Sequence, residues 1–156
     1  MGEERLIVGA ALGDCVHTAG VLNFLAAARR AGFRTEFLGP AVPVARVVEA
    51  AGRRPDLLAL SYRLTPEAAE RLFAQLQEGL AAAGRAGQRL VFGGTPVVAE
   101  AAVRSGLFEA VFGAPGGPEA EEYLAGGTAM RSRHDWAGTL VERCRQAAPR
   151  PILRHH

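Results

Sequence analysis

The chain has 156 residues, of which 49% are hydrophobic and 22% charged, a balance typical of one globular domain with a buried core and unlike that of a disordered protein. Its 18 basic residues, all of them arginine, exceed the acidic ones by only two, too few to indicate a nucleic-acid-binding surface. No run approaches the about 20 apolar residues of a membrane span, and the polar start lacks a signal-peptide pattern. Two cysteines, Cys15 and Cys144, are too few for a disulfide scaffold. We expect a cytoplasmic protein that binds neither nucleic acid nor membrane.

Short apolar runs alternate with segments of helical spacing over most of the chain. The runs predict strands at residues 6–12, 35–38, 57–61, 89–92 and 108–112. The spacing between them predicts helices at residues 18–31, 44–51, 66–83, 97–103 and 118–124. Strands that are apolar throughout indicate a sheet covered on both faces. Five strand–helix units in series therefore predict an α/β fold, a flavodoxin-like (Rossmann-like) doubly wound parallel sheet, and the size suits the strand order 2-1-3-4-5.

The last thirty or so residues differ from the rest. We expect residues 1–126 to form the α/β domain and residues 127–156 a C-terminal helix, over 135–147, followed by an extended tail. The tail begins at Pro149, cannot continue the helix, and could link the domain to another module. The closing pair, His155 and His156, is either native or added to the chain, so we do not count it as a site.

Ligands of open α/β sheets bind beyond the carboxyl ends of the strands. The loops expected at that edge are residues 13–20, 61–65, 93–96 and 113–117. All are rich in glycine, small or hydroxyl residues, which let a bulky ligand approach the backbone. No Gly-x-Gly-x-x-Gly or Walker-type loop occurs, which argues against a nucleotide site. With Thr18 alone in the first loop, the hydroxyls that a flavin phosphate needs are also too few.

His17 is the outstanding residue at this edge. Imidazole is the commonest metal ligand in proteins, and a carboxylate usually holds its second nitrogen. Asp14, three residues earlier, could fill that role. Because the four loops contain no other His, Asp or Glu, they do not predict a metal site built by several protein ligands. They favour a metal that brings most of its ligands with it, in a metallo-macrocycle; otherwise His17 merely opens the following helix.

The first loop resembles the Asp-x-His-x-x-Gly signature of the cobalamin (vitamin B12)-binding domain family, which includes methionine synthase and adenosylcobalamin-dependent mutases such as glutamate mutase. Residues 60–66 are similar to the family's Ser-x-Leu segment followed by Thr-Pro, and residues 92–95 to its paired glycines. Residues 112–116 resemble a segment of the glutamate mutase small subunit that closes over the nucleotide tail. The four segments occur in order between Arg5 and Ala125, and the resemblance implies the same strand order.

The resemblance implies that cobalamin binds base-off and His-on, with His17 as the lower axial ligand of cobalt and its nucleotide tail between sheet and helices. Ser61 and Thr65 would contact the tail base, Gly93 and Gly94 would leave room for the tail, and residues 113–116 would line its ribose-phosphate end. The implied cofactor-binding residues are Asp14, Cys15, Val16, His17, Thr18, Ala19, Gly20, Ser61, Tyr62, Arg63, Leu64, Thr65, Gly93, Gly94, Thr95, Gly113, Ala114, Pro115 and Gly116.

Two departures from the family pattern matter. Asp14 lies one residue too far from His17, so either the loop bulges and keeps an Asp–His hydrogen bond, or another group orients the imidazole. Arg63 stands where the family has an apolar Leu, and it could meet a corrin amide, meet a partner's carboxylate, or be a plain exposed charge. Cys15 borders the site as a thiol contact or as a small buried filler.

The resemblance also implies a role as a cofactor carrier, inactive alone, that presents cobalamin to a catalytic partner of the TIM-barrel type. Since the first strand begins by Arg5 with no helical cap before it, we expect the small subunit or domain of a mutase with adenosylcobalamin, an isomerase component. The alternatives are a corrinoid methyl-transfer carrier and a cobalamin-dependent sensory module. A response-regulator domain without cofactor is disfavoured, because Asp14 is the only carboxylate at the strand edges.

Overall fold

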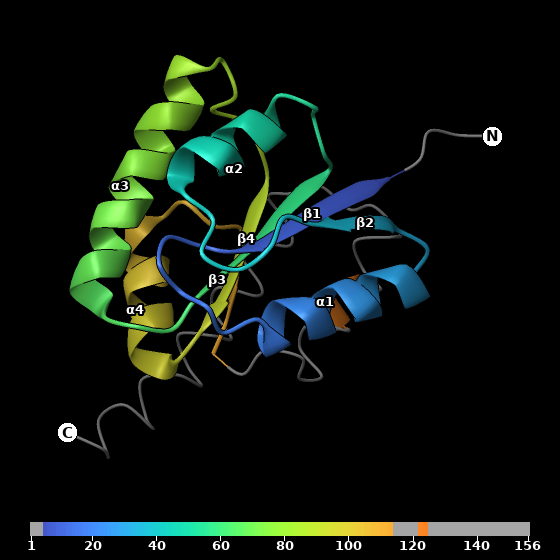
Figure 1. Ribbon diagram of the computed structural model, residues 1–156, viewed down its shortest axis with the longest axis horizontal. Helices are drawn as coiled ribbons and strands as arrows, with labels where there is room; N and C mark the ends of the chain where they lie inside the picture. The colour runs from blue at the N-terminus through green and yellow to red at the C-terminus, as the bar shows by residue number, and fades with distance from the viewer. Residues whose placement is uncertain (1–4, 114–121, 125–156) are drawn as a thin grey trace.

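A computed structural model describes residues 5–113 and 122–124 of the chain (Figure 1). Within them, five parallel strands lie in the order β2-β1-β3-β4-β5. The strands are β1 (Leu6–Ala11), β2 (Arg34–Phe37), β3 (Leu57–Tyr62), β4 (Leu90–Gly94) and β5 (Ala110–Phe112). The predicted α/β class and the flavodoxin-like strand order are confirmed.

The connecting helices cover both faces of the sheet. They are α1 (Ala19–Arg30), α2 (Val44–Ala51), α3 (Pro66–Ala82) and α4 (Pro96–Ser105). Helices α2, α3 and α4 pack on one face, whereas α1 and the short helical stretch 122–124 pack on the other (Figure 1). Each face therefore has its own hydrophobic cluster, as the uniformly apolar strands predict.

The alternation of side chains along β3 decides which residues reach the site. Successive residues of a strand point to opposite faces of the sheet. Tyr62, only 1% exposed, belongs to the cluster under α3, whereas Ser61, 4% exposed, shares a pocket with Val21 and Phe24 of α1. The two neighbours in the predicted site thus serve different sides of the sheet.

A buried polar network ties the end of the described chain to the sheet. Arg89 donates two hydrogen bonds to Glu109, at 2.9 and 2.7 Å, and the Tyr123 hydroxyl donates to the same carboxylate. Glu109 is 5% exposed and Tyr123 2%. The charge-assisted pairing raises the pKa of Arg89, and burial, followed by the charge of Glu109, raises the pKa of Tyr123. A buried carboxylate is tolerated here because it is paired with a cation and hydrogen-bonded.

The predicted element boundaries shift by two residues in three places: at the end of β4 (Gly94 instead of residue 92), at the end of α4 (Ser105 instead of residue 103) and at the start of β5. The last strand begins at Ala110 rather than at residue 108, because Phe108 instead packs into an aromatic cluster, 5.0 Å from the ring centre of Phe73 and 5.1 Å from that of Phe92. Of the predicted helix over 118–124, residues 122–124 are described and are helical. Every helix in the described ranges is too short or too polar to span a membrane.

Several predictions fall on residues outside the described ranges. They concern the boundary at residue 126, the helix at 135–147, the tail from Pro149 with His155 and His156, Cys144, and the site residues Ala114, Pro115 and Gly116.

Candidate functional site

The loop after β1 is fixed by backbone hydrogen bonds to its neighbours. The Leu12 N–H donates to the Ser61 carbonyl at 2.9 Å, and the Gly13 N–H donates to the Val42 carbonyl at 2.8 Å. Gly13 has a φ of +68°, and a Cβ there would lie 2.7 Å from a methyl carbon of Leu72. Only glycine combines that left-handed backbone with so little space. The start of the predicted ligand loop is therefore rigid.

His17 lies on the outer part of this loop and is exposed. Its Nδ1 is 3.7 Å from the Sγ of Cys15, within hydrogen-bonding range for sulfur, and Cys15 is fully buried. Among the described residues, Nε2 of His17 has no hydrogen-bond partner. The imidazole is thus held from one side by the protein core while its other nitrogen is left for a ligand.

Asp14 does not orient His17. Its Oδ1 accepts a hydrogen bond from the Tyr62 hydroxyl at 3.4 Å, and in the described part of the chain this is its hydrogen-bond partner. The loop therefore does not bulge to restore the expected Asp–His contact. Cys15, two residues before His17, occupies the position that the signature gives to aspartate, and it makes the contact with the ring.

An open hollow surrounds His17 at the carboxyl edge of the sheet. It has an empty volume of about 850 Å³, part of it open to solvent, and its lining comprises His17, Thr18, Ala19, Gly20, Asn23 and Arg63. Asn23, from α1, is the lining residue that the sequence analysis missed, because its amide gave no signal apart from an exposed helical position. Arg63 is exposed and makes no ion pair with any described residue, so its guanidinium is available at the rim.

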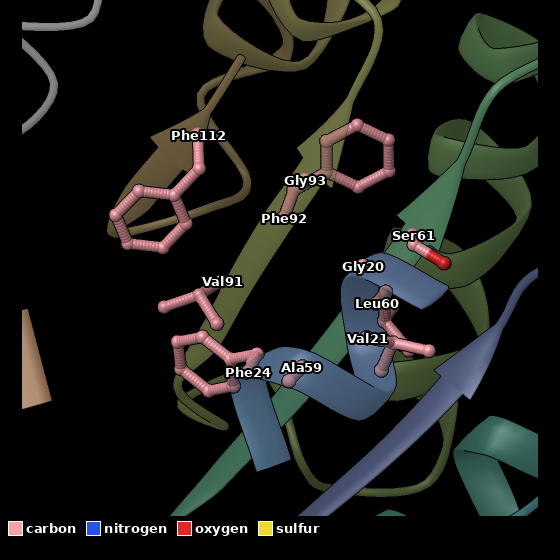
Figure 2. Close-up of a pocket in the computed structure, with 10 residues that line it drawn as sticks. All are labelled: Gly20, Val21, Phe24, Ala59, Leu60, Ser61, Val91, Phe92, Gly93 and Phe112. Carbon is pink, nitrogen blue, oxygen red and sulfur yellow. The ribbon is translucent and has the colours of Figure 1, made fainter. Parts of the chain in front are cut away.

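A second, narrower pocket runs between α1 and the sheet (Figure 2). Its empty volume is about 330 Å³, and its lining comprises Gly20, Val21, Phe24, Ala59, Leu60, Ser61, Val91, Phe92, Gly93 and Phe112. We call it the apolar slot. Gly20 lines both the slot and the hollow around His17, so the two spaces lie next to each other at the start of α1. The resemblance implies a space between sheet and helices, but the sequence does not name its apolar walls, because residues that line such a slot have the same pattern as core residues.

The Ser61 hydroxyl is the one polar side-chain atom of the described residues that is buried without a hydrogen-bond partner. It belongs to the slot, where Figure 2 shows it at the end of β3. An unsatisfied buried hydroxyl costs about 1–3 kcal/mol. A ligand that enters the slot with a hydrogen-bonding atom would remove that cost.

The remaining predicted residues of the third-strand edge lie apart from the slot. The Thr65 hydroxyl accepts a hydrogen bond from the Ala68 N–H at 3.2 Å and caps α3. Tyr62 is buried on the opposite face, where burial first, and then the negative charge of Asp14, raise its pKa. Leu64 is 41% exposed, like Val16 at 64% in the first loop, and both leave apolar surface near the hollow.

The paired glycines have different surroundings. Gly93 lines the slot. Gly94 does not, and a Cβ on it would lie 2.5 Å from the Tyr62 carbonyl oxygen, so it serves the packing of β3 against β4. Thr95 precedes α4 and makes no capping bond with its side chain, and Gly113, partly exposed, ends the described loop after β5.

The donor set of the described residues offers no conventional metal site and suits a macrocycle. Within residues 5–113 and 122–124, no three His, Cys, Asp or Glu side chains gather to hold a metal ion. The sequence model described as "B12 binding domain" matches residues 5–122. The chain belongs to the B12-binding domain family. It is therefore a cobalamin-binding domain, and the predicted family is confirmed.

Solved structures of related fold accompany this match. A cobalamin-binding protein from Desulfitobacterium hafniense DCB-2 has a TM-score of 0.64 at 24% identity, over 86% of this chain and 60% of that one. The methanol:cobalamin methyltransferase complex MtaBC from Methanosarcina barkeri has a TM-score of 0.68 at 20% identity, over 86% of this chain and 51% of that one. The Methanosarcina barkeri monomethylamine corrinoid protein has a TM-score of 0.63 at 23% identity, over 80% of this chain and 58% of that one.

At these identities the likeness shows a shared fold. The B12-binding domain described here spans between half and two thirds of each of those chains. No curated protein matches the sequence.

The residues present fit cobalamin. The exposed His17 offers one ring nitrogen beside an open hollow, and the hollow lies next to a slot that contains an unsatisfied hydroxyl. Cobalamin would bring most of its metal's ligands with it, so the single ring nitrogen that His17 offers would be enough from the protein.

Proposed function

We propose that this B12-binding domain holds cobalamin with Nε2 of His17 as the lower axial ligand and with the nucleotide tail in the apolar slot. The observation that carries the proposal is the unsatisfied Ser61 hydroxyl, buried in a slot that shares Gly20 of its lining with the His17 hollow. A domain that never filled this slot would gain stability by replacing the serine with alanine. The hydroxyl is best explained as a partner for the tail base.

Different residues of the apolar slot would make different kinds of contact with the nucleotide tail. Phe24, Val91 and Phe112 supply apolar walls that favour a flat aromatic base. Gly93 has no side chain and so leaves room for the tail. Ser61 contributes the hydrogen bond that fixes the orientation of the base. Thr65 is not needed, because its hydroxyl oxygen already caps α3.

The domain acts as a carrier that requires a catalytic partner. Bound cobalamin supplies the cobalt–carbon chemistry, while the protein positions the cofactor and tunes it through the axial ligand. Around the hollow, His17 and Arg63 are the only ionisable side chains of the described lining, so no general base stands ready for a substrate. A separate catalytic subunit or domain, of the TIM-barrel type, would provide the substrate pocket.

Two classes of cobalamin-dependent reaction are candidates for this carrier. The resemblance of residues 112–116 to a segment of the glutamate mutase small subunit supports a component of an adenosylcobalamin-dependent isomerase, which we propose first. The second candidate is a methyl-transfer carrier. It is supported by the shared fold of the methanol:cobalamin methyltransferase complex and the monomethylamine corrinoid protein. The upper ligand on cobalamin, identified after purification from the native cell in the dark, separates them: adenosyl supports the first and methyl the second.

Titration of the purified protein with hydroxocobalamin tests the cofactor and its axial ligand. We expect stoichiometric retention through gel filtration, and a visible spectrum that changes to a water-ligated, base-off form in His17→Ala. The chain has three other histidines, His134, His155 and His156, and a variant with all three replaced by alanine is the matched control, expected to keep the wild-type spectrum. Loss of the spectrum in the control instead of in His17→Ala would overturn the assignment of His17, and no retained corrin would overturn the function.

A further inference from the structure

We propose that Cys15 is the positioning residue for His17: its Sγ holds the ring at Nδ1 and so makes Nε2 the metal-binding nitrogen. This inference deepens the proposed function and rests on it. The observation behind it is the 3.7 Å contact between Cys15 Sγ and His17 Nδ1, in a loop where the nearest carboxylate is engaged elsewhere.

The sulfur is held in place from several sides. Cys15 is fully buried in the cluster under α3. Its N–H donates to the Leu12 carbonyl at 3.2 Å, and its carbonyl accepts from the Ala41 N–H at 2.8 Å. A side chain whose backbone is fixed at both ends and whose thiol is packed in the core offers a rigid anchor. The exposed imidazole has no other hydrogen-bond anchor among the described residues.

Asp14 offers the contrasting case. It is exposed, and it is occupied by the Tyr62 hydroxyl at 3.4 Å. Of the two side chains that precede His17 within three residues and carry a hydrogen-bonding group, the structure therefore brings only the thiol to the ring.

The chemistry of the contact follows from the metal-bound state. When Nε2 binds a metal, the ring proton resides on Nδ1, so Nδ1–H donates and Sγ of Cys15 accepts. Sulfur is a weak acceptor, whereas a carboxylate forms a strong, charge-assisted hydrogen bond. The thiol therefore orients the ring while adding little negative charge to it. We therefore expect His17 to bind cobalt less strongly than a histidine supported by a carboxylate would, and to release it more readily.

The test measures how much of the loaded protein has His17 bound to cobalt. Protein labelled with ¹⁵N-histidine is loaded with cob(II)alamin, and the electron paramagnetic resonance spectrum separates the His-on form, through coupling to ¹⁵N, from the water-ligated form. Loss of an outer-shell partner typically lowers metal affinity 10–100-fold. Because sulfur accepts weakly, we expect the ratio of His-on to His-off to fall about 10-fold in Cys15→Ala and to recover in Cys15→Ser, whose hydroxyl is also an acceptor.

Asp14→Ala is the matched control, since it removes a polar side chain of the same loop that does not touch the ring. An unchanged ratio in Cys15→Ala, with the fold intact by circular dichroism, would overturn the proposal, as would an equal fall in Asp14→Ala. If Cys15→Ala does not fold, Cys15→Ser decides. It must then keep the His-on form, and a His-off spectrum in a folded serine variant would contradict a hydrogen-bonding role.

A measurement without cofactor separates this inference from the proposed function. In ¹⁵N-histidine-labelled protein, the Nδ1 signal of His17, assigned by its loss in His17→Ala, is expected to shift in Cys15→Ser and to stay unchanged in Asp14→Ala. If the wild type retains no corrin but shows this pattern, the function fails while the contact stands. If it retains corrin through His17 and the Nδ1 signal ignores Cys15, the function stands and the positioning role fails.

Discussion

The Tyr62 hydroxyl, at the end of β3, donates a hydrogen bond to Asp14 Oδ1 across 3.4 Å, and this bond joins the loop after β1 to the strand beside it. Tyr62 is buried beneath that loop, and its pKa is raised by burial and by the negative charge of Asp14, so it stays protonated and remains a donor. The carboxylate nearest to His17 in the sequence therefore stabilises the loop instead of holding the imidazole.

Replacement of Asp14 should accordingly leave axial ligation intact. We expect Asp14→Ala to keep the His-on spectrum of the cobalamin-loaded protein within about twofold, while the free energy of unfolding falls by about 1 kcal/mol through the lost hydrogen bond. Visible spectroscopy and urea unfolding measure the two effects. A His-off spectrum in this variant would mean that Asp14 supports His17 when the cofactor is bound. Tyr62→Phe removes the same bond from the other side and should behave alike.

The sheet could be predicted from the sequence because the pattern that specifies each strand and helix lies within a short stretch of residues. Apolar runs of strand length separated by helical spacing give an α/β sheet with little ambiguity, and glycines and Thr-Pro pairs mark the turns. The strand boundary at residue 108 failed because a long-range aromatic contact of Phe108 with Phe73 and Phe92 overrides the local pattern.

The candidate site was only partly predictable, for physical reasons. The positions of His17 and Ser61 at the carboxyl edge follow from topology. That Cys15 rather than Asp14 contacts His17 does not follow from topology, because it depends on which way each side chain of a tight loop points. The resemblance implies a space for the tail between sheet and helices, but its lining could not be predicted, since residues such as Phe24 and Phe112 have the same sequence pattern whether they fill a core or border a space.

Removal of the Ser61 hydroxyl should have opposite effects on stability and on binding. In the free protein the hydroxyl is buried without a partner, so Ser61→Ala should raise the free energy of unfolding by about 1 kcal/mol. In the complex the same change removes a hydrogen bond to the tail, and we expect the dissociation constant for cobalamin to rise about 5- to 10-fold. Urea unfolding and equilibrium titration measure the two quantities.

Ser105→Ala is the matched control for this prediction. The Ser105 hydroxyl donates to the Ala102 carbonyl at 2.7 Å and accepts from the Leu107 N–H at 3.2 Å, at the far end of α4. Its loss should destabilise the domain and leave cobalamin binding unchanged. If Ser61→Ala behaves like this control, destabilised with normal binding, the hydroxyl is satisfied in solution and does not contact the tail.

Gly94 should be intolerant of a side chain even without cofactor. A Cβ there would lie 2.5 Å from the Tyr62 carbonyl oxygen and 3.0 Å from the ring of Phe92, so Gly94→Ala should force β3 and β4 apart and lower the free energy of unfolding by about 1–3 kcal/mol. Gly87→Ala, where a Cβ meets nothing within 4 Å, is the control and should change stability little. Equal stability of the two variants, measured by urea unfolding, would mean that the strand ends adjust freely.

Alkaline pH should unfold the domain through its two tyrosines, Tyr62 and Tyr123. The chain has no lysine, so few other groups titrate near pH 10. Burial raises the pKa of both tyrosines above the usual 10, and the stability they contribute is therefore fully present below pH 10 and lost above it. Between pH 10 and their folded pKa values the unfolded chain has released protons that the folded one keeps, so the free energy of unfolding should fall by about 1.4 kcal/mol per pH unit for each tyrosine.

Urea unfolding at pH 8, 10 and 11, together with tyrosinate absorbance, measures this effect. Tyrosinate should appear only as the protein unfolds. Tyr123→Phe should be less stable than wild type at pH 8, because Glu109 loses a hydrogen-bond donor while keeping Arg89, and its stability should fall about half as steeply above pH 10. Tyrosinate that forms at pH 10 in the folded protein would show that the hydroxyls are open to solvent, and the burial argued for Tyr62 and Tyr123 would then be wrong.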